Sequence, residues 1–180
     1  NFIITNRQAT HPIVHFHTLF SKKPFVGATM AISSHLTLLT GIAGINVYIV
    51  RILKLPFDIS LHFYFFFFVG VIITGILKMF FYSSVGAGFL GTLGSSALLY
   101  VSIHWIILGN TINIPLLYIQ GLLLGFGASM TLVSGSMATL LDGDLKEAAQ
   151  RSQTMHTIRN FSAAMLIPII AYTIKNHIQK

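Results

Sequence analysis

Residues 61–77 read LHFYFFFFVGVIITGIL, in which six aromatic residues follow one another and no side chain carries a permanent charge. A helix in lipid can be apolar on every side, because acyl chains rather than water surround it. A buried strand is the competing interpretation of such a run. We favour the membrane helix, because the rest of the chain has the same apolar character.

The composition of the whole chain is too apolar for a soluble domain. Of its 180 residues, 54% are hydrophobic and only 8% are charged, and the mean hydropathy is +0.77. A soluble domain carries about 25% charged residues and needs polar residues to cover its outside. The composition therefore predicts an all-α, polytopic bundle of membrane helices, with the lipid bilayer as its surroundings.

Charge and cysteine content argue against several other classes of protein. The net charge of +7 is scattered between apolar runs, whereas nucleic-acid binders gather basic residues on one exposed face, so we expect no nucleic-acid partner. Cysteine is absent, which excludes a disulfide framework, a thiolate metal site and a cysteine nucleophile. No Gly-rich nucleotide loop and no HExxH pattern occurs, so we expect no cofactor, no metal site and no catalytic residue.

Five runs are close to the roughly 20 residues that a helix needs to cross a bilayer. We expect about five transmembrane helices, between a cytoplasmic lead-in at 1–24 and a short tail at 175–180. Their approximate bounds are 25–50, 59–77, 87–108, 115–141 and 157–174.

The fifth span is the least regular of the five. Its apolar part, 161–174, has the length of a buried or interfacial helix. Asp144 and Glu147 resemble a capping box, however. One helix could therefore begin near Leu145 outside the lipid and enter it after Arg159.

Basic residues indicate the orientation, because cytoplasmic connections carry an excess of lysine and arginine. Five spans place alternate connections on opposite sides, and the side with seven basic residues is expected to be cytoplasmic. These are Arg7, Lys22, Lys23, Lys78, Lys146, Arg151 and Arg159, against Arg51, Lys54, Lys175 and Lys180 on the other side.

Two segments resemble the C-terminal half of a transporter family, the fourteen-helix drug:proton antiporter branch of the major facilitator superfamily. HPIVHFHTLFSKKPF, at 11–25, resembles its cytoplasmic lead-in, with matches at His11, Pro12, Leu19, Phe20, Lys23 and Phe25. The connection before the fifth span is similar to that branch in its small residue, serine, arginine and second small residue, at Ala149, Ser152, Arg159 and Ser162. The order of the two motifs around the spans extends the likeness over nearly the whole chain.

The resemblance implies part of a secondary active transporter in a bacterial inner membrane, a multi-pass protein that exports drugs or other small molecules. Export would be coupled to protons and proceed by alternating access. A complete member has two six-helix bundles, so the chain is predicted to be a fragment, an incomplete half of that fold. Its expected partners are the missing N-terminal bundle, a small-molecule substrate and protons.

The resemblance also places three candidates for a cytoplasmic gate, Lys78, Ser152 and Arg159. Lys78 belongs to the loop predicted after the second span, GILKMFFYSSVGAG. This loop keeps the glycines and the basic residue of the family's gating pattern but lacks its acidic partner. We therefore do not expect a salt-bridge latch there.

Three histidines are candidates for a substrate or proton pathway. His35 lies about ten residues into the first span, roughly 15 Å deep and near the midplane, while His62 and His104 are expected at similar outer depths. Ionisable groups in lipid are costly unless they face a cavity or a partner, and free imidazole titrates near pH 6.5. Hydrogen bonding between helices or contact with headgroups is the alternative role for each.

The other pathway candidates are Thr37, Asn46 and Gln120. Thr37 belongs to a stripe of small and polar residues on one face of the first span, and Asn46 lies with His35 on nearly the opposite face. Only one of these faces can line a cavity, and the sequence leaves open which one. Gln120 is expected near the outer end of the fourth span, where it could hydrogen-bond a substrate.

Some residues are predicted to have structural roles. Gly121 and Gly125 form a GxxxG pair that Ser129 continues at helical spacing, so a neighbouring helix should approach closely along this Gly/Ser seam. Pro168 is predicted to kink the fifth helix. His11, His15 and His17 are interpreted as solvated residues rather than as a metal site.

The first functional hypothesis is thus a portion of a secondary transporter. A membrane scaffold or partner-binding subunit without transport activity, associating through the Gly/Ser seam, is the alternative. A histidine-dependent membrane enzyme is a third and weaker hypothesis.

Overall fold

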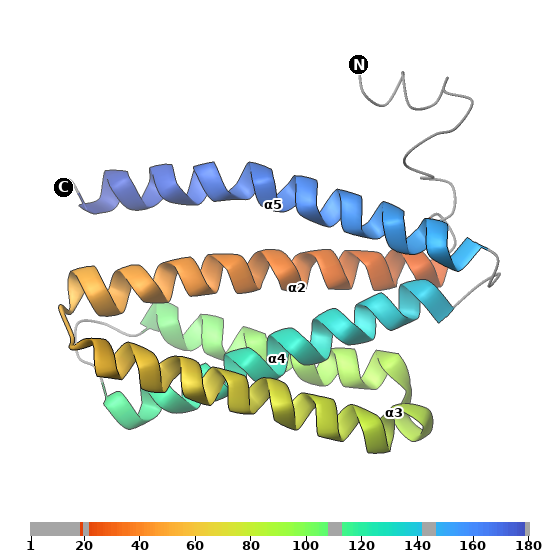
Figure 1. The fold of residues 1–180 in the computed structure, drawn as a ribbon, viewed down its shortest axis with the longest axis horizontal. Coiled ribbons are helices and arrows are strands. Elements are labelled where there is room, and N and C mark those ends of the chain that lie inside the picture. The colour runs from red at the N-terminus through yellow and green to blue at the C-terminus, as the bar shows by residue number, and fades with distance from the viewer. Residues whose placement is uncertain (1–18, 20–21, 108–112, 142–146, 179–180) are drawn as a thin grey trace.

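The computed structural model describes residues 19, 22–107, 113–141 and 147–178, and these ranges are all-α. Figure 1 shows the helices lying alongside one another as a bundle. Along the chain they are α2 (Lys22–Val47), the short π-helical segment η2 (Tyr48–Ile52), α3 (Phe57–Ile107), α4 (Ile114–Leu141) and α5 (Ala148–Ile178). The prediction of an all-α fold is confirmed.

Four helical stretches in the described ranges are long and apolar enough to cross a membrane, which is consistent with a membrane protein. They are Lys22–Ile52, Phe57–Ile107, Ile114–Leu141 and Ala148–Asn176. The second of these has 51 residues. At about 1.5 Å per residue, that is far longer than the roughly 30 Å of a bilayer core.

α3 contains one residue with non-helical backbone angles. Gly86 has φ 80° and ψ 164°, a conformation that is open to glycine but strained for residues with a side chain. It divides α3 into a first arm, 57–85, and a second arm, 87–107. The runs predicted as the second and third spans fall on these two arms.

The two arms of α3 run in opposite directions along α4. The first arm is parallel to α4, because its contacts move toward the end of α4 as the residue numbers rise. The second arm is antiparallel to α4, because its contacts move the other way. The contacts are Phe63 with Gly121, Phe67 with Gly125, Thr74 with Phe126 and Lys78 with Met130 in the first arm, and Gly91 with Ser134, Gly94 with Thr131, Leu98 with Gly127 and Trp105 with Gln120 in the second. Figure 1 shows this reversal between the yellow and the green parts of α3.

α2 packs closely and antiparallel against α4. Ser34 Oγ donates a hydrogen bond to the Ala128 carbonyl oxygen at 3.1 Å. Farther along, a Cβ atom built on Gly27 would lie only 2.7 Å from the Gly135 carbonyl oxygen. The two backbones can approach this closely only because small residues face each other.

α5 lies parallel to α2 on the outside of the bundle (Figure 1). Met155 near its start is buried in a cluster with Ala28 of α2, and Ile174 near its end borders the same groove as Asn46. Only 6% of the most apolar window of α5 is buried, against 50% in α4. α4 is therefore the centre of the described bundle, and α5 has a largely uncovered surface.

The structure corrects one predicted boundary. Residues 78–86 were expected to form a loop after a span ending at 77, but the helix continues to Val85 and only Gly86 leaves it. Lysine is a good helix former, and the charge of Lys78 is accommodated within the bundle because its Nζ donates to the carbonyl oxygen of Met130 at 2.9 Å and, more weakly, to that of Ser129 at 3.5 Å.

α5 is a single helix, as expected, and its helical assignment continues through Pro168. The predicted start of this helix near Leu145 and the Asp144 half of the capping box lie outside the described residues, as does nearly all of the predicted lead-in at 1–24.

Candidate functional site

Three side chains from α4 and the second arm of α3 meet near one end of the bundle. Trp105 Nε1 donates to Gln120 Oε1 at 2.8 Å, and Gln120 Nε2 lies 2.8 Å from His104 Nδ1. Gln120 is 0% exposed, so its amide makes no hydrogen bond with bulk solvent. We call these residues the His104–Gln120–Trp105 cluster.

The chemistry of the indole determines the protonation pattern of this cluster. An indole N–H is a donor only, so Gln120 must turn its oxygen toward Trp105 and its NH₂ group toward His104. An amide NH₂ group cannot accept a hydrogen bond, so His104 Nδ1 must be the acceptor. These two hydrogen bonds therefore require the His104 tautomer that carries its proton on Nε2.

His62 lies at the same level of the bundle, as expected from the sequence, but it makes different contacts. Its ring centroid is 5.7 Å from that of Tyr118, which precedes Gln120 by two residues on α4. Its Nδ1 lies 2.7 Å from the Asp58 carbonyl oxygen and must donate there, because a carbonyl oxygen only accepts. His62 and His104 thus attach to different partners.

Asn46 also lies at this end, where α2 passes the first arm of α3. Tyr64 Oη donates to Asn46 Oδ1 at 2.7 Å. Asn46 borders a groove between the ends of α2 and α5, together with Arg51 and Lys175. The structure therefore ties Asn46 to the first arm and does not join it to the His104–Gln120–Trp105 cluster.

A groove follows the line between α2 and the second arm of α3. It consists of two adjoining hollows of about 320 and 560 Å³, which share Thr37 and Ser102. Hydroxyl groups line it together with aliphatic side chains, and the ring of Trp105 lies at one end. The hydroxyl-bearing residues are Ser33, Ser34, Thr37, Thr40, Ser95, Ser102 and Thr131. We call it the α2–α3 groove.

The groove helps to show which of the two polar faces of α2 lines a cavity, a question that the sequence did not answer. Ser34 and Gly41 pack against neighbours, Ser34 through its bond to α4 and Gly41 beside Trp105. Thr37 on the same stripe is exposed and lines both hollows. The face of α2 that carries Ser34, Thr37 and Gly41 therefore combines packing with a groove lining, and His35 is absent from the lining of the described groove.

His35 instead lies toward α5. The charge of Arg159 acts on His35 and also on His156, one turn away on α5. The Nε atom of Arg159 is buried and has no hydrogen-bond partner among the described residues. Arg159 is thus near enough to His35 for its charge to act on the imidazole, although the sequence had assigned the two residues to different roles.

The remaining gate candidates, Lys78 and Ser152, lie apart from this pair. Lys78 is tied to α4 by its bond to the Met130 carbonyl oxygen. Ser152 is half-buried on the first turns of α5. The described contacts do not connect Lys78, Ser152 and Arg159 into one group.

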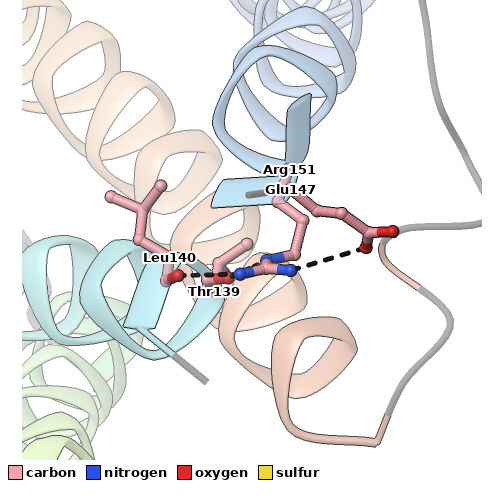
Figure 2. Close-up of polar contacts among 4 residues, drawn as sticks. All are labelled: Thr139, Leu140, Glu147 and Arg151. Atoms are coloured by element: carbon pink, nitrogen blue, oxygen red, sulfur yellow. Dashed lines mark hydrogen bonds and ion pairs between the residues drawn. The ribbon is translucent and has the colours of Figure 1, made fainter. Parts of the chain in front are cut away.

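Arg151 is a linking residue that the sequence analysis counted only as a positive charge. Its side chain is 2% exposed and reaches from α5 to the end of α4 (Figure 2), where Nε donates to the Thr139 carbonyl oxygen and Nη2 to that of Leu140, both at 3.0 Å. Its Nη1 lies 3.7 Å from Glu147 Oε2. Carbonyls in the last turn of a helix lack intrahelical partners and attract cations, so Arg151 caps α4 and joins it to α5.

The Gly/Ser seam of α4 is occupied within the chain. A Cβ on Gly125 would collide with the Phe67 carbonyl oxygen, and one on Gly121 would lie 2.8 Å from that of Phe63. Ser129 continues this side of α4 and accepts from Lys78 through its carbonyl oxygen. The seam therefore packs α4 against the first arm of α3.

The described residues contain no group of three or more metal-ligating side chains. His11, His15 and His17 lie outside the described residues.

Sequence reasoning missed Trp105, the one tryptophan of the chain. Its position next to His104 was a usable signal, because an indole N–H in an apolar setting needs an acceptor. The acceptor could not be identified from the sequence, because it depends on how α4 is rotated against α3.

Comparison of the chain with protein-family models, with curated proteins and with solved structures gives no match. Function is therefore inferred from the described residues and from the resemblance of the two sequence segments.

Proposed function

We propose that the chain is part of a membrane transporter of the major facilitator type, and that the α2–α3 groove contributes to the path of a small solute. The observation that carries this proposal is the location of the hydroxyl groups. Seven hydroxyl-bearing residues line the groove between these helices, while the outer surfaces of the same helices carry exposed apolar side chains such as Phe25, Phe89 and Ile103. In a bilayer, polar groups that face a cavity rather than lipid mark solute pathways.

The lining of the groove also favours one class of solute. Its described residues include no charged side chain, and hydroxyl groups, aliphatic groups and one indole ring provide the contacts. A cation would enter this groove without a carboxylate to balance its charge, which is unfavourable in an apolar setting. The proposed solute is therefore uncharged, largely apolar and able to stack on Trp105. Coupling to protons and the outward direction of transport are supported by the family resemblance alone.

Export of an uncharged dye tests the proposal. The complete reading frame that contains these residues is expressed in cells that lack their own exporters, and Nile red efflux is measured with ethidium as the cationic comparison. We expect Thr37→Leu to slow Nile red efflux by about tenfold, a loss of about 1.4 kcal/mol, because it replaces the hydroxyl group that both hollows share with a larger apolar side chain.

Thr29→Leu is the matched control. Thr29 is an exposed threonine on the same helix that lines neither hollow, so efflux should remain at the wild-type rate. Absence of efflux for both dyes, with the protein present in the membrane, contradicts transport. Equal rates in the two leucine variants contradict the groove as the solute path.

A scaffold function is the second candidate, and the uncovered face of α5 favours it. Phe161, Met165, Ile169 and Tyr172 on this helix are largely exposed. Since the Gly/Ser seam is occupied within the chain, a partner helix would have to use this face of α5 rather than the seam. Loss of a co-purifying membrane partner upon Met165→Lys, with efflux absent in the wild type, would support the scaffold.

A further inference from the structure

We propose that His104 is a proton-binding site whose occupancy controls the position of Trp105 through Gln120. The proposal concerns a switch within the bundle, and it does not depend on whether the chain transports a solute. It rests on the two hydrogen bonds of the Gln120 side chain and on the burial of that side chain.

The hydrogen bonds of the cluster are compatible with neutral His104 only. Trp105 Nε1 and Gln120 Nε2 are both donors, and each needs an acceptor at 2.8 Å. Gln120 Oε1 accepts the hydrogen bond of the indole N–H, and the lone pair of His104 Nδ1 accepts the hydrogen bond of the amide NH₂ group. A proton on Nδ1 removes that lone pair and places two donors opposite each other.

Protonation therefore has to move a side chain. If the Gln120 amide turns over, its oxygen can accept from His104, but its NH₂ group then faces the N–H of Trp105. If the amide stays in place, the imidazolium has to turn away. Gln120 is completely buried, so no bulk water is available to satisfy the displaced donor in place.

The ring of Trp105 is in a position to transmit this change to another helix. A Cβ atom built on Gly41 of α2 would lie 3.4 Å from Trp105 Cζ3, in ordinary contact with the ring. The same ring lines the larger hollow of the α2–α3 groove. A shift of Trp105 therefore changes both the contact between α2 and the second arm and the shape of the groove.

Other titratable groups at this end of the bundle do not share the bonds of Gln120. On the same arm, the Tyr100 ring lies 6.1 Å from that of His104. Tyr118 of α4 and His62 of the first arm contact each other. His62 donates from Nδ1 to the Asp58 carbonyl oxygen, so that a proton added at its Nε2 leaves this bond intact. The other described charged or titratable residues near this end include Tyr48, Arg51, Lys54, Asp58, Tyr64 and Lys175.

Fluorescence tests the switch directly, because Trp105 is the one tryptophan of the chain. The 180-residue protein is reconstituted into phosphatidylcholine vesicles, and its tryptophan emission is recorded from about pH 5 to 8, where imidazole titrates. We expect the emission of the wild type to change in one step. His104→Gln should abolish the step, whereas His62→Gln, the matched control at the same level, should keep it.

Two variants at Gln120 separate the switch from simple quenching by a nearby imidazolium. Gln120→Leu removes both hydrogen bonds, so the pH step should shrink to less than about one third of its amplitude. Gln120→Glu supplies two acceptor oxygens, one for the indole and one for protonated His104. The midpoint of its emission change should rise by about one pH unit or more, a tenfold gain in proton affinity.

Three results would each overturn the proposal: wild-type emission that is constant from about pH 5 to 8, a step that persists in His104→Gln, or a step of full size in Gln120→Leu. An unchanged midpoint in Gln120→Glu would also contradict it. Far-UV circular dichroism verifies that each variant keeps its helix content. If a variant does not fold, the wild-type titration still tests the proposal, because constant emission would overturn it.

Discussion

Replacing Gly70 with alanine is expected to lower the free energy of unfolding of the bundle by about 1–3 kcal/mol, the usual cost of overpacking. A Cβ atom at this position would collide with the Leu122 carbonyl oxygen and lie 2.7 Å from the Phe126 amide nitrogen. Both obstacles are backbone atoms of α4, so no side-chain rotation can make room. The first arm of α3 and α4 have to separate instead.

Gly75 provides the control for this prediction. It lies on the same arm, and a Cβ atom built there meets nothing within 4 Å. Gly75→Ala should therefore raise stability by about 0.5–1 kcal/mol through helix propensity. Denaturant titration of the detergent-solubilised protein, followed by far-UV circular dichroism, measures both variants. Equal stability of the two alanine variants would mean that α4 and the first arm are not in contact at Gly70.

Replacing Arg151 with methionine is expected to have the second large effect. The change removes two hydrogen bonds from a charged donor to the Thr139 and Leu140 carbonyl oxygens. Hydrogen bonds to charged groups contribute about 1.5–3 kcal/mol each, and the cap on α4 is lost with them. We expect the free energy of unfolding to fall by about 2–4 kcal/mol in the same titration.

Two further substitutions make this measurement specific. Arg151→Lys keeps the positive charge but not the fork of donors, so an intermediate loss is expected. Gln153→Met replaces an exposed residue of the same helix and should change stability by less than about 0.5 kcal/mol. A loss in Gln153→Met as large as that in Arg151→Met would contradict the capping role.

The apolar runs were sufficient to predict the helices, because their length and lack of charge depend on the sequence alone. The loop predicted after residue 77 was wrong, because the helix continues to Val85. Lys78 reads as the end of a span when taken by itself, but α4 supplies carbonyl oxygens to its ammonium group. The break at Gly86 was within the predicted loop, yet nothing in the sequence showed that a single residue would form it.

The candidate site was predictable as a set of residues but not as an arrangement. His104 and Gln120 were selected because polar groups are costly in lipid, and the structure brings them together. The charge of Arg159 also acts on His35, although the two residues had been assigned to separate roles. Pairs between helices depend on the rotation and register of each helix, which intrahelical spacing does not determine. The same limit explains why Trp105 and Arg151 were missed.

The turn at Gly86 has a consequence for biogenesis. Since one residue separates the arms of α3, the hairpin has no loop that could lie along the membrane surface between them. In a chain that crosses a bilayer, each arm satisfies its own backbone hydrogen bonds as a helix, and the only non-helical backbone within α3 is at Gly86. Polar contact between this hairpin and the membrane surface during integration is therefore confined to one residue and the helix ends beside it.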